Sequence, residues 1–322
     1  MEYTHLGRSG LSVSRLCLGT MNFGWKTEES DAHDLMDRAL AEGVNFFDTA
    51  NVYGFDAGKG RTEEVLGTWF ARGGERREKT VLATKVYGSM SDWPNADLLS
   101  ARNLVRSCEA SLRRMQTDWI DLYQFHHSDP ATPWDEIWQA CETLVAQGKV
   151  LYVGSSNHAA WQIAAANEAA ARRHFTGLVS EQSHYNLLTR HVELEVLPAA
   201  GHYGVGIIPW SPLAGGLLAG VLEEPEGTRR SEDRNRKRVE AHRPALQAYE
   251  DACREWGHAP ADVGLAWLLH QPAVTAPIVG PRTMEQFGGS LRALDVRLDA
   301  AQLARLDEIF PGYRAAPMEY AW

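Results

Sequence analysis

Apolar and polar residues follow two alternating patterns along this chain. Short β-rich apolar runs predict eight strands, at 15–18, 44–47, 80–83, 119–125, 150–153, 178–180, 206–210 and 274–279. Apolar residues recur at helical intervals between them, at 31–42, 62–72, 97–115, 134–147, 159–173 and 192–200. Alternation of this kind predicts a parallel sheet, and eight such units predict an α/β fold, a (β/α)₈ TIM barrel forming one domain over residues 1–322.

Three segments fall outside this repeat. Residues 1–13 are predicted to form a hairpin that turns at 7–10 and plugs one end of the barrel. Residues 211–243 are predicted to be a long polar loop beside the active site, because they follow an apolar strand directly. Residues 311–322 form a tail after a last helix at 300–310, and we expect this tail to cross the barrel mouth.

Composition and charge exclude several classes of protein. With 44% hydrophobic and 23% charged residues, the chain can bury a substantial core without disulfides. Its 4 cysteines form no C-x-x-C pair, which excludes a zinc ribbon and favours a reducing, cytoplasmic location. No apolar run approaches the roughly 18 residues of a membrane span, and the net charge of −10 has the wrong sign for phosphate backbones. We therefore expect neither a membrane nor a nucleic acid as partner, while the oligomeric state stays open.

Polar side chains end three neighbouring strands at the edge where barrels carry their chemistry. Asp48 ends the second strand with Tyr53 just beyond it, Lys85 ends the third, and His126 ends the fourth. A buried ammonium needs a partner, and Asp48 is the natural one for Lys85. The ammonium should in turn lower the pKa of Tyr53, while His126 orients a carbonyl oxygen beside the phenol. This set suits proton donation to a carbonyl group.

Each of these assignments has a plainer alternative. Asp48 and Lys85 could form a structural ion pair that stabilises the barrel end. His126, His127 and Asp129 could be metal ligands, but the other strand ends add only Asp48 to such a set, so we expect no metal. The basic stretch 229–238 is left unassigned because its acidic residues dilute the charge. Trp161 and Trp267 lie at helical spacing among apolar neighbours, and we expect both in the core.

The ordered set Asp48, Tyr53, Lys85 and His126 resembles the catalytic tetrad of the aldo-keto reductases. Segments that resemble the same family follow in the family's order: LGRSGLSVSRLCLGTMNFG, FDTANVYG, LATKVYG, DLYQFHHSDP, GKVLYVGSSNH, EQSHYNLL, IIPWSPLAGGLL and PIVGPRTMEQ. The similarity covers nearly the whole chain and is greatest to bacterial members related to potassium-channel beta subunits. It implies a barrel that binds NADPH or NADP+ without a Rossmann domain and passes a hydride to an aldehyde or ketone.

The resemblance also implies which residues bind the cofactor. At the nicotinamide end it places Gly19, Thr20, Met21, Asp48, Ser156, Asn157, Gln182 and Trp210. Around the pyrophosphate it places Ser211, Leu213, Gly215 and Leu217, and at the adenosine end Gly280, Arg282, Gln286 and Ser290. Two features depart from the family: Trp210 replaces a frequent tyrosine, and Gly289-Ser290 replaces a frequent Glu-Asn pair. Arg282, at the start of a helix, is expected to favour NADPH by binding its extra phosphate.

The substrate and the activity itself are less defined by the sequence. Aromatic residues expected at the barrel mouth, where they would pack a small carbonyl substrate, are Trp25, Phe55, Trp93 and Trp322. The intact tetrad favours an NADPH-dependent carbonyl reductase over the alternative, a cofactor-binding regulatory subunit with little turnover. Loops rather than the barrel set substrate choice, so the carbonyl compound and its pathway stay unnamed.

Overall fold

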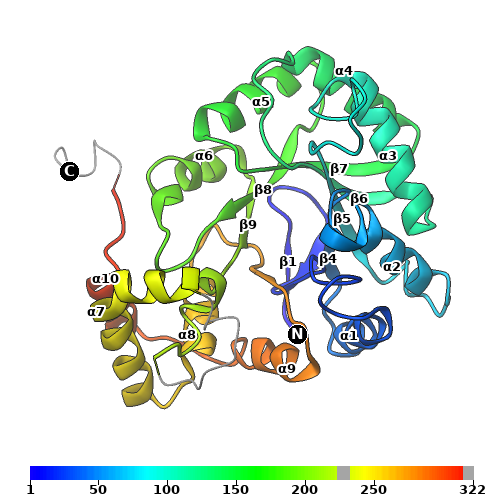
Figure 1. The fold of residues 1–322 in the computed structure, drawn as a ribbon. Helices are drawn as coiled ribbons and strands as arrows, with labels where there is room; N and C mark the ends of the chain where they lie inside the picture. The colour runs from blue at the N-terminus through cyan, green and yellow to red at the C-terminus, as the bar shows by residue number, and fades with distance from the viewer. Residues whose placement is uncertain (223–232, 315–322) are drawn as a thin grey trace.

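A parallel sheet rolled into a nearly closed barrel forms the centre of the computed structural model, which describes residues 1–222 and 233–314 (Figure 1). The barrel strands are β3 (Cys17–Gly19), β4 (Phe46–Asp48), β5 (Val81–Val86), β6 (Ile120–Phe125), β7 (Val150–Ser156), β8 (Leu178–His184), β9 (Gly206–Trp210) and β10 (Ile278–Val279). They pair in the order β10-β3-β4-β5-β6-β7-β8-β9. A bridge between Ile207 and Val274 links the two ends of this order. The predicted (β/α)₈ barrel is therefore confirmed.

Helices surround the strands on the outside (Figure 1). They are α1 (Glu29–Ala41), α2 (Arg61–Phe70), α3 (Ala101–Met115), α4 (Trp134–Ala146), α5 (Ala160–Arg172), α6 (Val196–Tyr203), α7 (Asp233–Trp256), α8 (Pro260–Leu269), α9 (Met284–Arg292) and α10 (Ala300–Ile309), with short 3₁₀ turns η1 (Phe55–Ala57), η2 (His191–Glu193) and η3 (Ala214–Gly216). Large side chains such as Trp69 and Trp138 fill the layer between helices and strands, and the cysteines are buried free thiols. Within the described ranges, no helix is long and apolar enough to cross a membrane.

Several predicted boundaries are wrong. The loop predicted at 211–243 ends earlier, because α7 begins at Asp233 and buries Val239, Leu246 and Tyr249 along one face. Its polar composition and an internal Pro244 hide this pattern in the sequence; residues 223–232 lie outside the described part of the chain. The strand predicted at 274–279 shortens to β10, although Thr275 N–H still donates to the carbonyl oxygen of Ile207 at 2.8 Å.

The two tryptophans expected in the core behave differently. Trp267 in α8 is 1% exposed, as predicted, but Trp161 in α5 is 65% exposed. The buried face of α5 runs through Ile163, Ala166 and Ala170, and Trp161 lies off this face. An error of one or two positions in the phase of a helical pattern is enough to move a side chain from core to surface.

The amino terminus closes one end of the barrel. Strands β1 (Tyr3–His5) and β2 (Ser12–Ser14) pair antiparallel, so the predicted hairpin is confirmed. Its side chains Leu6 and Val13 are fully buried against barrel-interior residues, including Phe46 at the beginning of β4. The hairpin therefore plugs the end where the strands begin and leaves the opposite end, where they finish, open for chemistry.

Gly7 lets the hairpin approach the barrel closely. Its φ angle is +54°, and a methyl group there would lie 2.6 Å from the Gly204 oxygen and 2.7 Å from the Gly206 nitrogen. We expect Gly7→Ala to lower the free energy of unfolding by about 2 kcal/mol, from backbone strain and overpacking combined. Gly10→Ala is the matched control in the same turn, because a Cβ there meets nothing within 4 Å. Urea unfolding of both variants measures the difference; equal stability of the two would contradict the close docking.

Candidate active site

The Asp48 carboxylate gathers three side chains at the carboxyl ends of the strands. Asp48 is the last residue of β4 and is 4% exposed. Its Oδ2 accepts a hydrogen bond from Lys85 Nζ at 2.6 Å, so the predicted ion pair is present. Its Oδ1 accepts from Gln124 Nε2 at 3.0 Å and from Gln182 Nε2 at 2.8 Å. These three donors, one of them charged, replace the hydrogen bonds to water that the Asp48 carboxylate loses on burial.

Lys85 extends from β5 into the same buried space. Besides Asp48, its Nζ donates to the Thr49 carbonyl oxygen at 2.9 Å and lies 3.3 Å from the Tyr53 hydroxyl. An ammonium has three donors, and these three acceptors use all of them. Burial is the largest single influence and lowers the pKa of Lys85, but the Asp48 carboxylate and the Tyr53 hydroxyl together outweigh it and raise this pKa above its usual value. The ammonium therefore stays charged beside the phenol.

Tyr53 lies in the loop between β4 and η1. Its carbonyl oxygen accepts the Gly60 N–H at 3.1 Å, which ties the loop to the start of α2. Burial raises the pKa of Tyr53, and the Lys85 ammonium lowers it by less, so the net shift is upward. The expectation that Lys85 lowers this pKa overall is thus wrong, because it weighed the charge without the burial. Tyr53 keeps its proton at neutral pH, which is the state that a proton donor needs.

His126 follows β6 and meets the edge of the Tyr53 ring. The two ring centroids lie 5.9 Å apart at an interplanar angle of 79°. Burial lowers the pKa of His126 to about 3, with smaller contributions from Lys85 and His127. The imidazole is therefore neutral at physiological pH and offers one N–H donor and one acceptor nitrogen.

His127 and Asp129, which were considered with His126 as alternative metal ligands, contact residues of the surrounding loops. The His127 ring stacks on His126 at 5.2 Å and packs against Tyr87. The Asp129 carboxylate accepts hydrogen bonds from the Leu99 N–H at 3.1 Å and the Thr132 hydroxyl at 2.6 Å. These contacts tie the loop after β6 to the loop before α3, a structural use of the Asp129 oxygens.

The residues assigned to the nicotinamide end form a connected group. Asn157 Nδ2 donates to the His126 carbonyl oxygen at 3.2 Å and to Ser156 Oγ at 3.0 Å. The Trp210 indole N–H donates to Asn157 Oδ1 at 3.0 Å. The Trp210 ring stacks on His184 at 4.2 Å, an arrangement that holds the indole flat at the end of β9. On the other side, Thr20 Oγ1 donates to the Asp48 carbonyl oxygen at 2.9 Å, Gly19 ends β3, and Met21 is exposed just beyond.

Glu181 makes hydrogen bonds to residues on both sides of Ser156 and Asn157. It was not recognised in the sequence as part of the site. It is fully buried in β8, where its carboxylate accepts from Ser155 Oγ at 2.5 Å, Ser183 Oγ at 3.0 Å and the His158 N–H at 3.1 Å. Burial raises the pKa of Glu181 to about 7. Its bonds fix the backbone that carries Ser156 and Asn157. The sequence signal is an acidic residue directly after the strand predicted at 178–180, which in the structure continues to His184.

The segment after β9 has an unusual backbone. Ser211, Ala214, Gly215 and Gly216 have φ angles of +54°, +52°, +70° and +102°. The segment is partly closed on itself, because the Ala214 N–H donates to the Ser211 carbonyl oxygen at 2.9 Å and the Gly216 N–H donates to the Leu213 carbonyl oxygen at 2.8 Å. Arg238 of α7 donates to the Ala214 carbonyl oxygen at 3.2 Å, which adds a cation that the sequence left unassigned within a basic stretch. The apolar residues here serve as anchors: Leu217 is buried, and Leu213 packs on the core.

The segment from Gly280 to Ser290 comprises the loop after β10 and most of α9. The Gly280 carbonyl oxygen accepts from Asn22 Nδ2 at 3.2 Å, which links it to the loop after β3. Gln286 Oε1 accepts the Arg282 N–H at 2.8 Å, and the Gln286 carbonyl oxygen accepts from Ser290 Oγ at 3.1 Å. The Gln286 side chain therefore caps its own helix, and the partly exposed Arg282 side chain flanks the helix amino terminus.

Two of the aromatic residues expected at the barrel mouth pack against each other. Trp25 and Phe55 pack at 4.3 Å between centroids, and Phe55, two residues after Tyr53, is 50% exposed. Trp93 lies in the loop after β5 and is 79% exposed. Trp322 lies outside the described residues, and so does most of the tail expected to cross the mouth.

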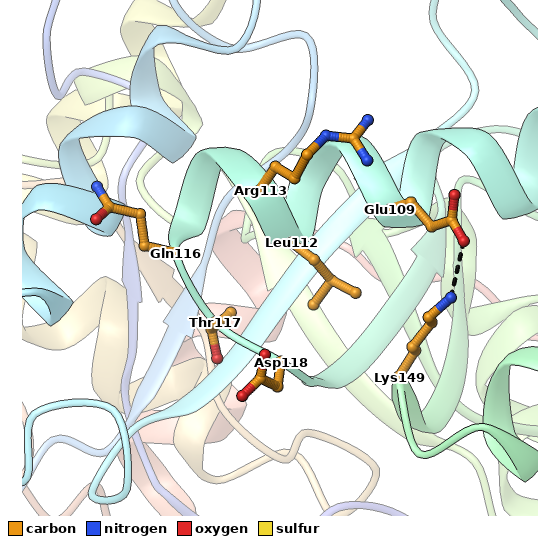
Figure 2. Close-up of a pocket in the computed structure, with 7 residues that line it drawn as sticks. All are labelled: Glu109, Leu112, Arg113, Gln116, Thr117, Asp118 and Lys149. Atoms are coloured by element: carbon orange, nitrogen blue, oxygen red, sulfur yellow. Dashed lines mark hydrogen bonds and ion pairs between the residues drawn. The ribbon is translucent and has the colours of Figure 1, made fainter.

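A hollow of about 560 Å³ lies away from this site (Figure 2). It is lined by Glu109, Leu112, Arg113, Gln116, Thr117, Asp118 and Lys149. These residues belong to the end of α3 and to the segments that enter β6 and β7, at the barrel end opposite Asp48. A Glu109–Lys149 ion pair of 2.7 Å crosses its rim. Residues at this end of a barrel generally serve stability.

Comparison with known proteins agrees with the geometry. A family model described as Aldo/keto reductase family matches residues 15–310. Over the full length of both chains, the protein is 53% identical to the Uncharacterized oxidoreductase YrpG of Bacillus subtilis. It is 32% identical to a Probable voltage-gated potassium channel subunit beta of Arabidopsis thaliana, over 99% of this chain and 100% of that one. It is 30% identical to the Versiconal hemiacetal acetate reductase of Aspergillus parasiticus, over 98% and 100%. The family model and the two relatives named as an oxidoreductase and a reductase support a general oxidoreductase role. The chain belongs to the aldo/keto reductase family.

Proposed function

We propose that this protein is an NADPH-dependent oxidoreductase that reduces an aldehyde or a ketone to an alcohol, with Tyr53 as general acid. The observation that carries the proposal is the position of Lys85 Nζ, 2.6 Å from the Asp48 carboxylate and 3.3 Å from the Tyr53 hydroxyl. When bound, the nicotinamide cofactor supplies the hydride that the carbonyl carbon accepts. The chain's own residues supply the proton and hold the reacting groups.

Tyr53 donates its hydroxyl proton to the carbonyl oxygen and becomes a phenolate. The Lys85 ammonium stabilises this phenolate, and the Asp48 carboxylate keeps the ammonium charged and in place. Neutral His126 donates a hydrogen bond to the same carbonyl oxygen and so orients it beside the phenol. The outcome balances: the carbon gains a hydride, the oxygen gains a proton, and Tyr53 is reprotonated from solvent after the alcohol leaves.

The donor and acceptor groups of the site fit such a cofactor. Gln182 Oε1 can accept a hydrogen bond from the carboxamide NH₂ group, because both N–H groups of Gln182 are bonded to Asp48 and Gln124. Ser156 and Asn157 place a hydroxyl and an amide beside it. Gly215 and Gly216 let a pyrophosphate approach the backbone closely, and Arg238, which contacts Ala214, adds a positive charge beside them. Arg282 beside the amino terminus of α9 suits the extra phosphate of NADPH.

The alternative is a regulatory subunit that binds cofactor with little turnover. It is favoured by the relatives named as potassium-channel beta subunits. The assembled Asp48, Tyr53, Lys85 and His126 favour the enzyme. An aldehyde and ketone panel with NADPH separates the two, because the alternative gives cofactor binding without product.

Loss of the Tyr53 hydroxyl tests the general acid. We expect Tyr53→Phe to lower kcat/KM for carbonyl reduction by at least about 100-fold, because a positioned proton donor contributes at least this much. The affinity for NADPH, measured by tryptophan fluorescence, should stay the same. Tyr152→Phe is the matched control, since Tyr152 packs with the hairpin cluster at the other end of the barrel. Near-normal turnover in Tyr53→Phe would refute its role.

Cofactor preference tests Arg282. A charge-assisted contact to phosphate is worth about 1.5 to 3 kcal/mol, so Arg282→Ala should weaken NADPH binding by roughly ten- to a hundredfold. NADH binding should hardly change, because NADH lacks this phosphate. Arg292→Ala, at the other end of α9 where Arg292 pairs with Asp262, is the control and should alter neither affinity. Equal weakening of both cofactors by Arg282→Ala, or a wild-type preference for NADH, would show that the assignment is wrong.

A further inference from the structure

Gln124 is a fully buried amide inside the barrel to which the proposed mechanism gives no role. It belongs to β6, and both ends of its side chain are used. Its Nε2 donates to Asp48 Oδ1 at 3.0 Å, and its Oε1 accepts from Gln182 Nε2 at 3.3 Å. Gly154 of the neighbouring strand β7 packs against it, since a Cβ there would lie 3.3 Å from Gln124 Cγ. Gln124 thus bridges the proton-donating group and the cofactor end of the site.

The charge of Asp48 decides which way both amides face. An ionised carboxylate only accepts hydrogen bonds, so Gln124 and Gln182 must each present their NH₂ group to Asp48 Oδ1. With its NH₂ group turned toward Asp48, Gln124 presents Oε1 to Gln182. This oxygen takes the second N–H of Gln182.

The opposite orientation of Gln182 is excluded by the same contacts. A flipped Gln182 amide would place its oxygen against Asp48 Oδ1 and Gln124 Oε1, two acceptors, with no hydrogen between them. It would lose two hydrogen bonds in a buried place, where unpaired polar groups are costly. Gln182 Oε1 is therefore the atom that remains for a ligand, and it can only accept.

We propose that Gln124 is a positioning residue that, together with Asp48, locks the Gln182 amide so that the site demands an N–H donor from the cofactor. This inference rests on the proposed function, because the donor is the primary amide of the nicotinamide. Gln124 itself does not touch the cofactor. Its role is to make the site selective for a carboxamide over groups of similar shape that lack the N–H.

A cofactor analogue tests this selectivity directly. In the 3-acetylpyridine analogue of NADP+, a methyl group replaces the amide nitrogen, so no N–H reaches Gln182 Oε1. We expect wild-type protein to bind this analogue about tenfold more weakly than NADP+, the cost of one unpaired buried acceptor, as measured by tryptophan fluorescence. In Gln124→Met, which keeps the volume and removes the polar atoms, Gln182 loses one of its two restraints. The discrimination should then fall to about threefold or less.

Two further variants guard against an effect that comes only from altered folding or stability of Gln124→Met. Gln124→Leu is a second apolar replacement with the same expected loss of discrimination. Tyr123→Phe is the matched control on β6, because it removes a buried hydrogen bond to the Leu104 carbonyl oxygen at 3.2 Å. It should lower stability while leaving the tenfold discrimination intact.

The outcomes separate this inference from the proposed function. Weaker binding of the analogue to wild type, with discrimination lost in Gln124→Met or Gln124→Leu and kept in Tyr123→Phe, supports the inference. Equal binding of NADP+ and the analogue to wild type overturns it while the proposed function stands, and so does full discrimination in a Gln124 variant. Because two apolar replacements are made, the failure of one to fold leaves the other to decide whether Gln124 restrains Gln182. Binding of neither ligand to wild type overturns the proposed function itself.

Discussion

The buried negative charge of Asp48 is the constraint on which the open end of the barrel depends. A carboxylate out of water is costly unless it is paired and hydrogen-bonded, and Lys85, Gln124 and Gln182 meet both conditions. Each partner is thereby fixed: the ammonium stays charged, and the two amides cannot turn. One ionised group thus sets the electrostatics of the phenol and the hydrogen-bonding character of the cofactor end.

The rest of the barrel makes this arrangement rigid. The hairpin closes the end of the barrel where the strands begin, and its Leu6 and Val13 pack against the side chains inside the barrel. Glu181 holds the backbone of Ser156 and Asn157 through its own set of hydrogen bonds. The Trp25–Phe55 pair and Trp93 lie in loops beyond the strand ends. Loops at this end of a barrel generally determine which substrate is bound.

Features that depend on residues close together in the chain could be predicted from the sequence better than features that depend on distant residues. The barrel follows from alternating strand and helix patterns, and the Asp48–Lys85 pair follows because a lysine closing an apolar strand needs a partner. The pKa of Tyr53 could not be predicted, because burial depends on residues distant in the chain. The start of α7 was hidden by polar residues and Pro244. Gln124 gave no signal of its own, and Glu181 gave only that of an acidic residue directly after a predicted strand, since both act through neighbours on other strands.

The central claim about the site is that Asp48 governs both the proton-donating group and the proposed cofactor end. Asp48→Asn tests this most directly, since an amide oxygen and an NH₂ group cannot accept from Lys85, Gln124 and Gln182 together. Binding of NADPH and of 2′,5′-ADP, which lacks the nicotinamide, is compared by fluorescence titration. The account predicts that Asp48→Asn weakens NADPH binding by about tenfold and leaves 2′,5′-ADP binding unchanged. Unchanged NADPH affinity, or an equal loss for both ligands, would contradict it.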